Sequence, residues 1–141
     1  MATYRMQSVK TQYYPVTDGA KDGAILATKN GASVVPPNTT LTFSAPVKDK
    51  PVIVTIAGPD GLYITLPDGA VDGTKLTWTT TAYEWTVNPT VASDNSITYQ
   101  FSPADGQNFY MFDEFGIGPV IIAKSGATIV PPQSFFSLTM A

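Results

Sequence analysis

The sequence predicts an all-β fold made of three copies of one four-strand unit, and three observations support this prediction. Twelve prolines, eleven glycines and many β-branched and aromatic residues favour short strands joined by turns. Apolar and polar residues alternate with period two in several segments, as they do in strands. Stretches of the chain also recur at fixed offsets. The composition, 43% apolar and 13% charged over 141 residues, is that of a single globular domain.

Internal repetition is strongest between residues 23–37 and 118–132, where seven of fifteen pairs are identical. The identical pairs are Gly23/Gly118, Lys29/Lys124, Gly31/Gly126, Ala32/Ala127, Val35/Val130, Pro36/Pro131 and Pro37/Pro132. An offset of 50 places residues 18–23 on 68–73, and Asp113 and Gly118 bound the matching loop of a third copy. The 141 residues therefore divide into predicted repeats of residues 1–47, 48–93 and 94–141.

Each repeat predicts four strands. The first strands alternate over residues 4–6, 52–56 and 97–101, and the second strands cover 12–16, 62–66 and 108–112. A turn containing Asp precedes the third strands at 24–28, 75–79 and 120–123. Apolar pairs mark the fourth strands, namely Leu41/Phe43, Trp85/Val87 and Phe136/Leu138. Twelve strands with a threefold period predict a β-trefoil, a small barrel capped by hairpins, whereas the alternative β-sandwich gives no reason for the period.

The composition excludes several classes of function. The chain has no cysteine and no histidine, so it cannot form a disulfide, a Cys/His zinc site or a Ser-His-Asp triad. Its net charge is −3 and its eight basic residues are scattered, which argues against a nucleic-acid partner. No apolar run is long enough to span a membrane and the N-terminus lacks a signal-peptide pattern, so we expect a cytoplasmic protein. The prediction is a non-catalytic binding protein that needs no cofactor or metal.

An aromatic cluster in the second repeat is one candidate site. Trp78, Tyr83 and Trp85 lie within eight residues of one another, with Thr80 among the polar neighbours. Aromatic rings beside hydroxyl groups are suited to binding the apolar face and the hydroxyls of a sugar. Trp85 also fits the core, because apolar residues stand at the same place in the other two repeats. The sequence therefore predicts a possible glycan-binding surface centred on Trp78 and Tyr83.

The loop of residues 17–23 in the first repeat is the other candidate. It contains Asp18, Gly19, Ala20, Lys21 and Asp22, and it is predicted to project between two strands. A braced, projecting loop can enter a protease cleft, and Lys21 would suit the acidic specificity pocket of a trypsin-like enzyme. The alternative interpretation is a structural turn with Lys21 exposed to solvent.

Acidic pairs recur at the same place in the three repeats. They are Asp18/Asp22, Asp68/Asp72 and Asp113/Glu114. Two carboxylates could hydrolyse a glycoside, but recurrence inside turns favours structural Asx-turns, with a polar contact to a bound sugar as a further possibility.

Residues 62–74, which include Leu62, Tyr63 and the Asp68-Gly69 turn, resemble a repeat of the mushroom β-trefoil serine protease inhibitors, the mycospins. Residues 85–89, with Trp85-Thr86, and residues 97–114 are similar to the same pattern. The resemblance implies a fungal defence protein that inhibits proteases through the loop at residues 17–23, with Lys21 where that family suggests Asn. Fungal β-trefoil lectins are the neighbouring family. The Gln-x-Trp triplet of ricin-type lectins is replaced here by Tyr83-Glu84-Trp85, and the aromatic cluster resembles that of small mushroom lectins.

Two functional hypotheses therefore stand, with protease inhibition first and glycan binding as the alternative. They differ in the substitution that matters, which is Lys21→Ala for inhibition and Trp78→Ala for glycan binding. A third possibility is a scaffold or storage role, in which neither substitution would change more than stability.

Overall fold

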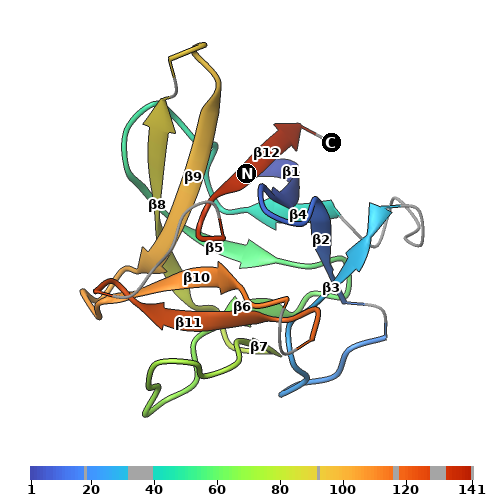
Figure 1. The fold of residues 1–141 in the computed structure, drawn as a ribbon. Helices are drawn as coiled ribbons and strands as arrows, with labels where there is room; N and C mark the ends of the chain where they lie inside the picture. Colours follow the sequence, from blue (N-terminus) through green and yellow to red (C-terminus); the bar gives the residue numbers. More distant parts are fainter. Residues whose placement is uncertain (18, 32–39, 92, 116–117, 128–132, 141) are drawn as a thin grey trace.

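The computed structural model describes residues 1–17, 19–31, 40–91, 93–115, 118–127 and 133–140. In these residues the chain forms twelve strands and no α-helix (Figure 1). The strands are β1 (Ala2–Ser8), β2 (Tyr13–Val16), β3 (Ala27–Asn30), β4 (Thr40–Phe43), β5 (Val52–Ala57), β6 (Tyr63–Thr65), β7 (Thr77–Thr79), β8 (Glu84–Val91), β9 (Ile97–Pro103), β10 (Phe109–Asp113), β11 (Ile121–Ser125) and β12 (Phe136–Met140). The all-β prediction and its number of strands are confirmed. The Pro36-Pro37 and Pro131-Pro132 pairs lie outside the described residues.

Six of the strands close into a barrel. They pair in the order β4-β1-β12-β9-β8-β5, and β5 then pairs back with β4. Every pairing is antiparallel. The two ends of the chain lie side by side, because Tyr4 on β1 is opposite Met140 on β12 (Figure 1). Closure leaves no unpaired strand edge around the barrel, which removes a template for aggregation.

The other six strands form three hairpins, β2–β3, β6–β7 and β10–β11, one in each repeat. A ring of backbone hydrogen bonds joins the three hairpins. Leu26 N donates to Leu76 O at 2.9 Å, Leu76 N donates to Ile121 O at 3.0 Å, and Ile121 N donates to Leu26 O at 3.1 Å. Each repeat thus donates to the next in a closed cycle, which shows that the three hairpins are related by a threefold rotation.

A second cycle has its donors two residues further along the chain and runs around the three repeats in the opposite direction. Its bonds run from Trp78 N to Ala24 O (2.8 Å), from Ala123 N to Thr74 O (2.7 Å) and from Thr28 N to Pro119 O (2.7 Å). Trp78, Ala123 and Thr28 therefore occupy equivalent positions in the three repeats. Because two of the three are small residues in contact with neighbouring hairpins, this position belongs to the interior of the fold.

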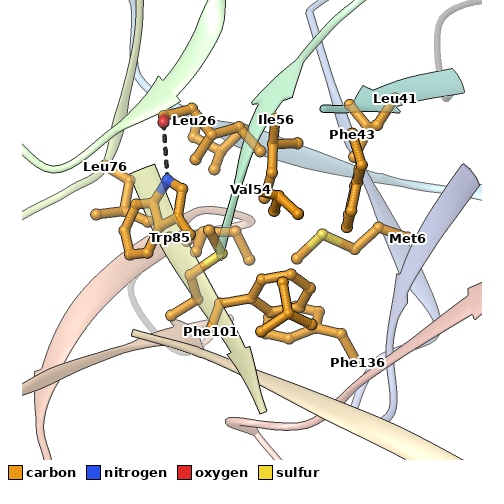
Figure 2. Packing of buried hydrophobic residues seen from close by; sticks show 14 of the residues in the cluster. Met6, Leu26, Leu41, Phe43, Val54, Ile56, Leu76, Trp85, Phe101 and Phe136 are labelled. Atoms are coloured by element: carbon orange, nitrogen blue, oxygen red, sulfur yellow. Dashed lines mark hydrogen bonds between the residues drawn. The ribbon is translucent and has the colours of Figure 1, made fainter. Parts of the chain in front are cut away.

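The centre of the barrel is filled by large side chains from all three repeats. The ring of Phe101 lies edge-on to those of Phe43 and Phe136, with centroid distances of 6.2 and 5.8 Å (Figure 2). Met6 and Trp85 complete the layer, and all five side chains are at most 1% exposed. Burial of each side chain of this size stabilises the fold by about 1.5–3 kcal/mol, so this layer contributes strongly to the stability of the barrel.

The third strands begin later than the sequence predicts in the first two repeats. Ile25 forms only an isolated bridge with Thr77, and paired strand begins at Ala27. The reason is tertiary, because Ala24 O and Leu26 N bond to the second repeat and Leu26 O bonds to the third, rather than to β2. The alternation of apolar and polar residues does not show whether a strand will pair with β2 or with another repeat.

Replacing Thr28 by valine should raise the free energy of unfolding by about 1 kcal/mol. Thr28 is 1% exposed, and its Oγ1 has no hydrogen-bond partner within the described ranges. A buried hydroxyl without a partner costs about 1–3 kcal/mol, and valine has the same shape and a strong preference for strands. Chemical denaturation would measure the change. A midpoint below that of the wild type would mean that the hydroxyl has a partner in solution.

Candidate functional site

Both tryptophans belong to the interior. Trp78 is 0% exposed and its indole Nε1 donates to Val16 O at 3.3 Å. Trp85, labelled in Figure 2, is 1% exposed and its Nε1 donates to Ile64 O at 2.9 Å. With no exposed ring face, neither indole can stack on a sugar. The prediction that Trp78 forms a binding surface is therefore wrong, and the core interpretation of Trp85 holds. The alternation Thr77-Trp78-Thr79 and the small residues at equivalent positions were the signals that place Trp78 inside.

Tyr83 and Thr80 remain at the surface. Tyr83 is half-buried, and its ring lies 5.1 Å from that of Trp85 at an interplanar angle of 56°. Thr80 is exposed, and its backbone N–H donates to Asp22 Oδ1 at 3.0 Å. Trp85 thus supports Tyr83 from below, while Asp22 fixes the loop that carries Thr80.

A groove of about 500 Å³ lies between these two residues and the loop that follows β6. Its walls carry the carboxylates of Asp22 and Asp68, the ring of Tyr83 and a group of threonines. The threonines are Thr65, Thr77, Thr79, Thr80 and Thr81. Such a surface offers many hydroxyls, two negative charges and one aromatic ring. Thr65, Thr77 and Thr81 were not predicted from the sequence, because threonine alone is a weak signal.

The threonine hydroxyls of the groove form an adaptable network. Thr65 Oγ1 and Thr79 Oγ1 are 2.7 Å apart, Thr65 Oγ1 is 3.1 Å from Tyr63 O, and Thr79 Oγ1 is 3.0 Å from Thr81 O. Two hydroxyls carry two protons, so only two of these three contacts can hold a hydrogen bond at any moment. The hydroxyls can therefore rotate to accept from, or donate to, a ligand without loss of the fold.

The Tyr83 hydroxyl is enclosed and electrostatically unusual. Its Oη is buried and has no hydrogen-bond partner among the residues that the structure describes, although the ring as a whole is only half-buried. Burial, together with the negative charges of Asp105 and Asp68, raises the pKa of Tyr83 to about 12. Burial is the larger cause, and the two carboxylates add to it because negative charges oppose formation of a phenolate.

Alkaline titration should detect this environment. The phenolate absorbance of wild type minus that of Tyr83→Phe should show a step near pH 12 rather than near 10. Because the folded pKa lies above the unfolded value, any stability linked to this phenol is complete below about pH 10 and is lost as the pH rises through about 12. A difference step near pH 10 would mean that the hydroxyl is open to solvent.

The predicted inhibitory loop is a braced turn. Ala20 N donates to Thr17 O at 2.7 Å, Ala24 N donates to Lys21 O at 2.9 Å, and the Lys21 side chain is exposed. The second repeat has a corresponding bond, from Thr74 N to Val71 O at 3.0 Å. Its recurrence favours a structural turn, while the exposure of Lys21 leaves inhibition as a prediction. Asp18 lies outside the described residues.

The acidic pairs are less equivalent than the sequence suggests. Asp22 and Asp72 play the same part, because Asp72 Oδ1 accepts from Ser125 N at 2.7 Å just as Asp22 accepts from Thr80 N. Each ties its loop to the next repeat, and Lys124 Nζ lies 3.8 Å from Asp72 Oδ2. This supports the structural interpretation of both residues.

Asp113 differs from Asp68, its predicted equivalent. It lies within β10, is 0% exposed and accepts from Thr11 Oγ1 at 2.6 Å. Asp68 lies in the loop after β6, so the two residues are not at one place in the fold. The loop of the third repeat is shorter, which moves Asp113 into the strand. No group of three or more acidic residues in the described ranges could hold a metal ion.

No family model and no curated sequence matches the chain. Solved structures do share its fold. The ricin B-like lectin of Macrolepiota procera, solved with lactose, has a TM-score of 0.73 at 16% identity, over 99% of this chain and 95% of that chain. The Rhizoctonia solani agglutinin has a TM-score of 0.76 at 16% identity, with the same coverage.

A designed threefold-symmetric protein, ThreeFoil, has a TM-score of 0.75 at 11% identity, over 99% of both chains. The fold is a β-trefoil. Identities this low show the fold alone, and the identification with the mycospins does not follow from them. The described residues contain no helix long and apolar enough to cross a membrane.

Proposed function

We propose that this β-trefoil binds glycans, without catalysis, in the groove of its second repeat. The observation that carries the proposal is the combination of threonine hydroxyls, Asp22, Asp68 and a supported Tyr83 around one groove. Sugars present hydroxyls that donate and accept hydrogen bonds, together with apolar C–H faces. The groove offers a partner for each of these groups.

Each wall of the groove has a definite part in the proposed complex. The Asp68 carboxylate has no hydrogen bond among the described residues and is free to accept from two sugar hydroxyls. The Thr65–Thr79 pair can reverse the direction of its hydrogen bonds to suit a hydroxyl in either orientation. Tyr83, backed by Trp85, offers a ring that loses little conformational freedom on binding.

The fold comparisons support this choice over protease inhibition. Two of the structurally similar proteins are named a lectin and an agglutinin, and one of them was solved with lactose. That likeness favours sugar binding in general, whereas the residues of the groove supply the argument for this chain.

Tyr83→Ala and Asp68→Asn should each weaken glycan binding about tenfold or more, which is about 1.4 kcal/mol. A glycan array would identify a ligand, and isothermal titration calorimetry would measure the variants. Asp60→Asn is the matched control, because Asp60 is an exposed acid in the turn between β5 and β6 and does not line the groove. An array without hits, or equal losses in all three variants, would refute the proposal.

Protease inhibition is the second candidate, and the exposed Lys21 on a braced turn favours it. Its test is titration against trypsin-like, chymotrypsin-like and papain-like proteases. Stoichiometric inhibition that Lys21→Ala abolishes would establish this activity, and full protease activity throughout would exclude it.

A further inference from the structure

A second hollow lies on the other side of Tyr83. It has a volume of about 320 Å³ and is lined by Ile53, Ala82, Tyr83, Glu84, Ala104 and Asp105. Ala82 and Tyr83 line the first groove as well, so the two spaces share one wall. A ligand longer than one sugar could therefore extend from the groove, past Tyr83, into the hollow.

The walls of the hollow come from elements that are held together. Ala104 N, just after β9, donates to Glu84 O at the start of β8 at 3.1 Å. On β8, Trp85 is paired with Pro103 of β9 on one side and with Val54 of β5 on the other. The hollow is thus built on the barrel itself, which gives it a defined shape before any ligand binds.

The chemistry of the hollow differs from that of the groove. Ile53 is 54% exposed and provides an apolar wall, while Glu84 and Asp105 provide two carboxylates. Asp105 accepts hydrogen bonds from Gln107 N at 3.2 Å and from Gln107 Nε2 at 2.8 Å, and both donors are neutral. Among the described residues, no lysine or arginine lines either space, so the walls themselves hold no positive charge to balance the carboxylates.

The surroundings of Tyr83 indicate which charge a ligand would carry. Its Oη is enclosed and lacks a hydrogen-bond partner in the described part of the chain, and the charges of Asp68 and Asp105 both act on it. Because this hydroxyl is closed to solvent, a ligand would meet the ring of Tyr83 rather than its oxygen. A positively charged donor would be attracted by the carboxylates on the two sides of the ring.

We propose that the site is bipartite, with a neutral sugar in the threonine-lined groove and a neighbouring sugar that carries a protonated amino group in the Ile53–Glu84–Asp105 hollow. The ammonium lies between the carboxylates of Glu84 and Asp105, and the apolar face of the same sugar packs on Ile53. The ligand class is an oligosaccharide with at least one free amine. This inference rests on the proposed glycan binding and specifies its ligand.

The test compares glucosamine oligosaccharides with their N-acetylated counterparts of equal length, by calorimetry at about pH 6, where an amine with a pKa near 8 is protonated. The free-amine form should bind about tenfold more tightly, as expected for hydrogen bonds to a charged group. The double variant Glu84→Gln and Asp105→Asn should remove this preference, so that both forms bind equally, whereas the control Asp60→Asn should keep it. High salt should reduce the preference as well.

Three other outcomes would overturn the inference, and each is distinct. Equal binding of both forms, with the Tyr83→Ala effect intact, would remove the second subsite and leave glycan binding standing. A preference lost in Asp68→Asn but not in the double variant would place the amine in the groove. Binding of a lysine-rich peptide that depends on Glu84 and Asp105, without any oligosaccharide binding, would make the hollow a peptide site. An array with no hits would instead refute the proposed function itself.

Discussion

Trp78→Ala is expected to lower the free energy of unfolding by about 3–5 kcal/mol. The side chain is 0% exposed, and its removal leaves a cavity beside the turn that follows β5 as well as a Val16 carbonyl without its donor. The loss would be read from the midpoint of urea unfolding followed by circular dichroism. At temperatures where the variant is folded, it should retain glycan binding, because the ring does not reach the groove surface.

Trp78→Phe is the control for this result. Phenylalanine keeps much of the ring volume but cannot donate to Val16 O, so we expect a smaller loss of about 1–2 kcal/mol. If Trp78→Ala abolished binding at unchanged stability, the indole would have to be a surface group, and the burial of Trp78 in the structure would be wrong.

Gly58→Ala should have the second-largest effect, a loss of about 1–3 kcal/mol. A Cβ at Gly58 would lie 2.6 Å from Thr17 Cγ2 and 3.0 Å from Trp78 Cζ3. Neither neighbour can move without a large energetic cost. Thr17 is buried and β-branched, and the Trp78 ring is held by its hydrogen bond to Val16 O. The clash crosses from the second repeat to the first, so it tests how tightly the repeats pack.

The double variant Gly58→Ala and Thr17→Ser distinguishes steric overlap from a backbone effect as the cause of this loss. Serine keeps the hydroxyl of Thr17 but removes Cγ2, the atom that the new methyl would meet. If steric overlap is responsible, the double variant should recover most of the stability lost by Gly58→Ala, beyond the sum of the two single changes. Strict additivity in a double-mutant cycle would point instead to a backbone effect at Gly58.

Much of the fold could be predicted from local patterns. The alternation at Val52–Ile56 and the apolar pair Phe136/Leu138 place strands where the structure has β5 and β12. The start of β3 could not be predicted in this way, because residues 24–26 pair with another repeat. A hydrogen bond between distant segments does not change the spacing of apolar residues in either segment, so that spacing cannot reveal it.

The candidate site was predicted only in part. Tyr83 and Thr80 line the groove as the glycan hypothesis requires, and Asp68 was a possible sugar contact. Trp78 was misplaced, because an aromatic residue looks the same in sequence whether its ring faces the core or the solvent. The sequence did not indicate that Asp105 belongs to the site. It lies in a different repeat from Tyr83, and the two residues line one hollow only because β8 pairs with β9.

The amino-acid sequence alone determined that this protein is all-β, with twelve strands and three recurring units, because period-two alternation and turn residues act over a few neighbouring positions. Only the tertiary structure decided which aromatic ring stays exposed and which charges surround it. Asp22, Asp68 and Tyr83 line one groove because the hairpins of two repeats are joined by hydrogen bonds between distant segments. Such bonds depend on the closed arrangement of all three repeats, which no single stretch of the chain contains.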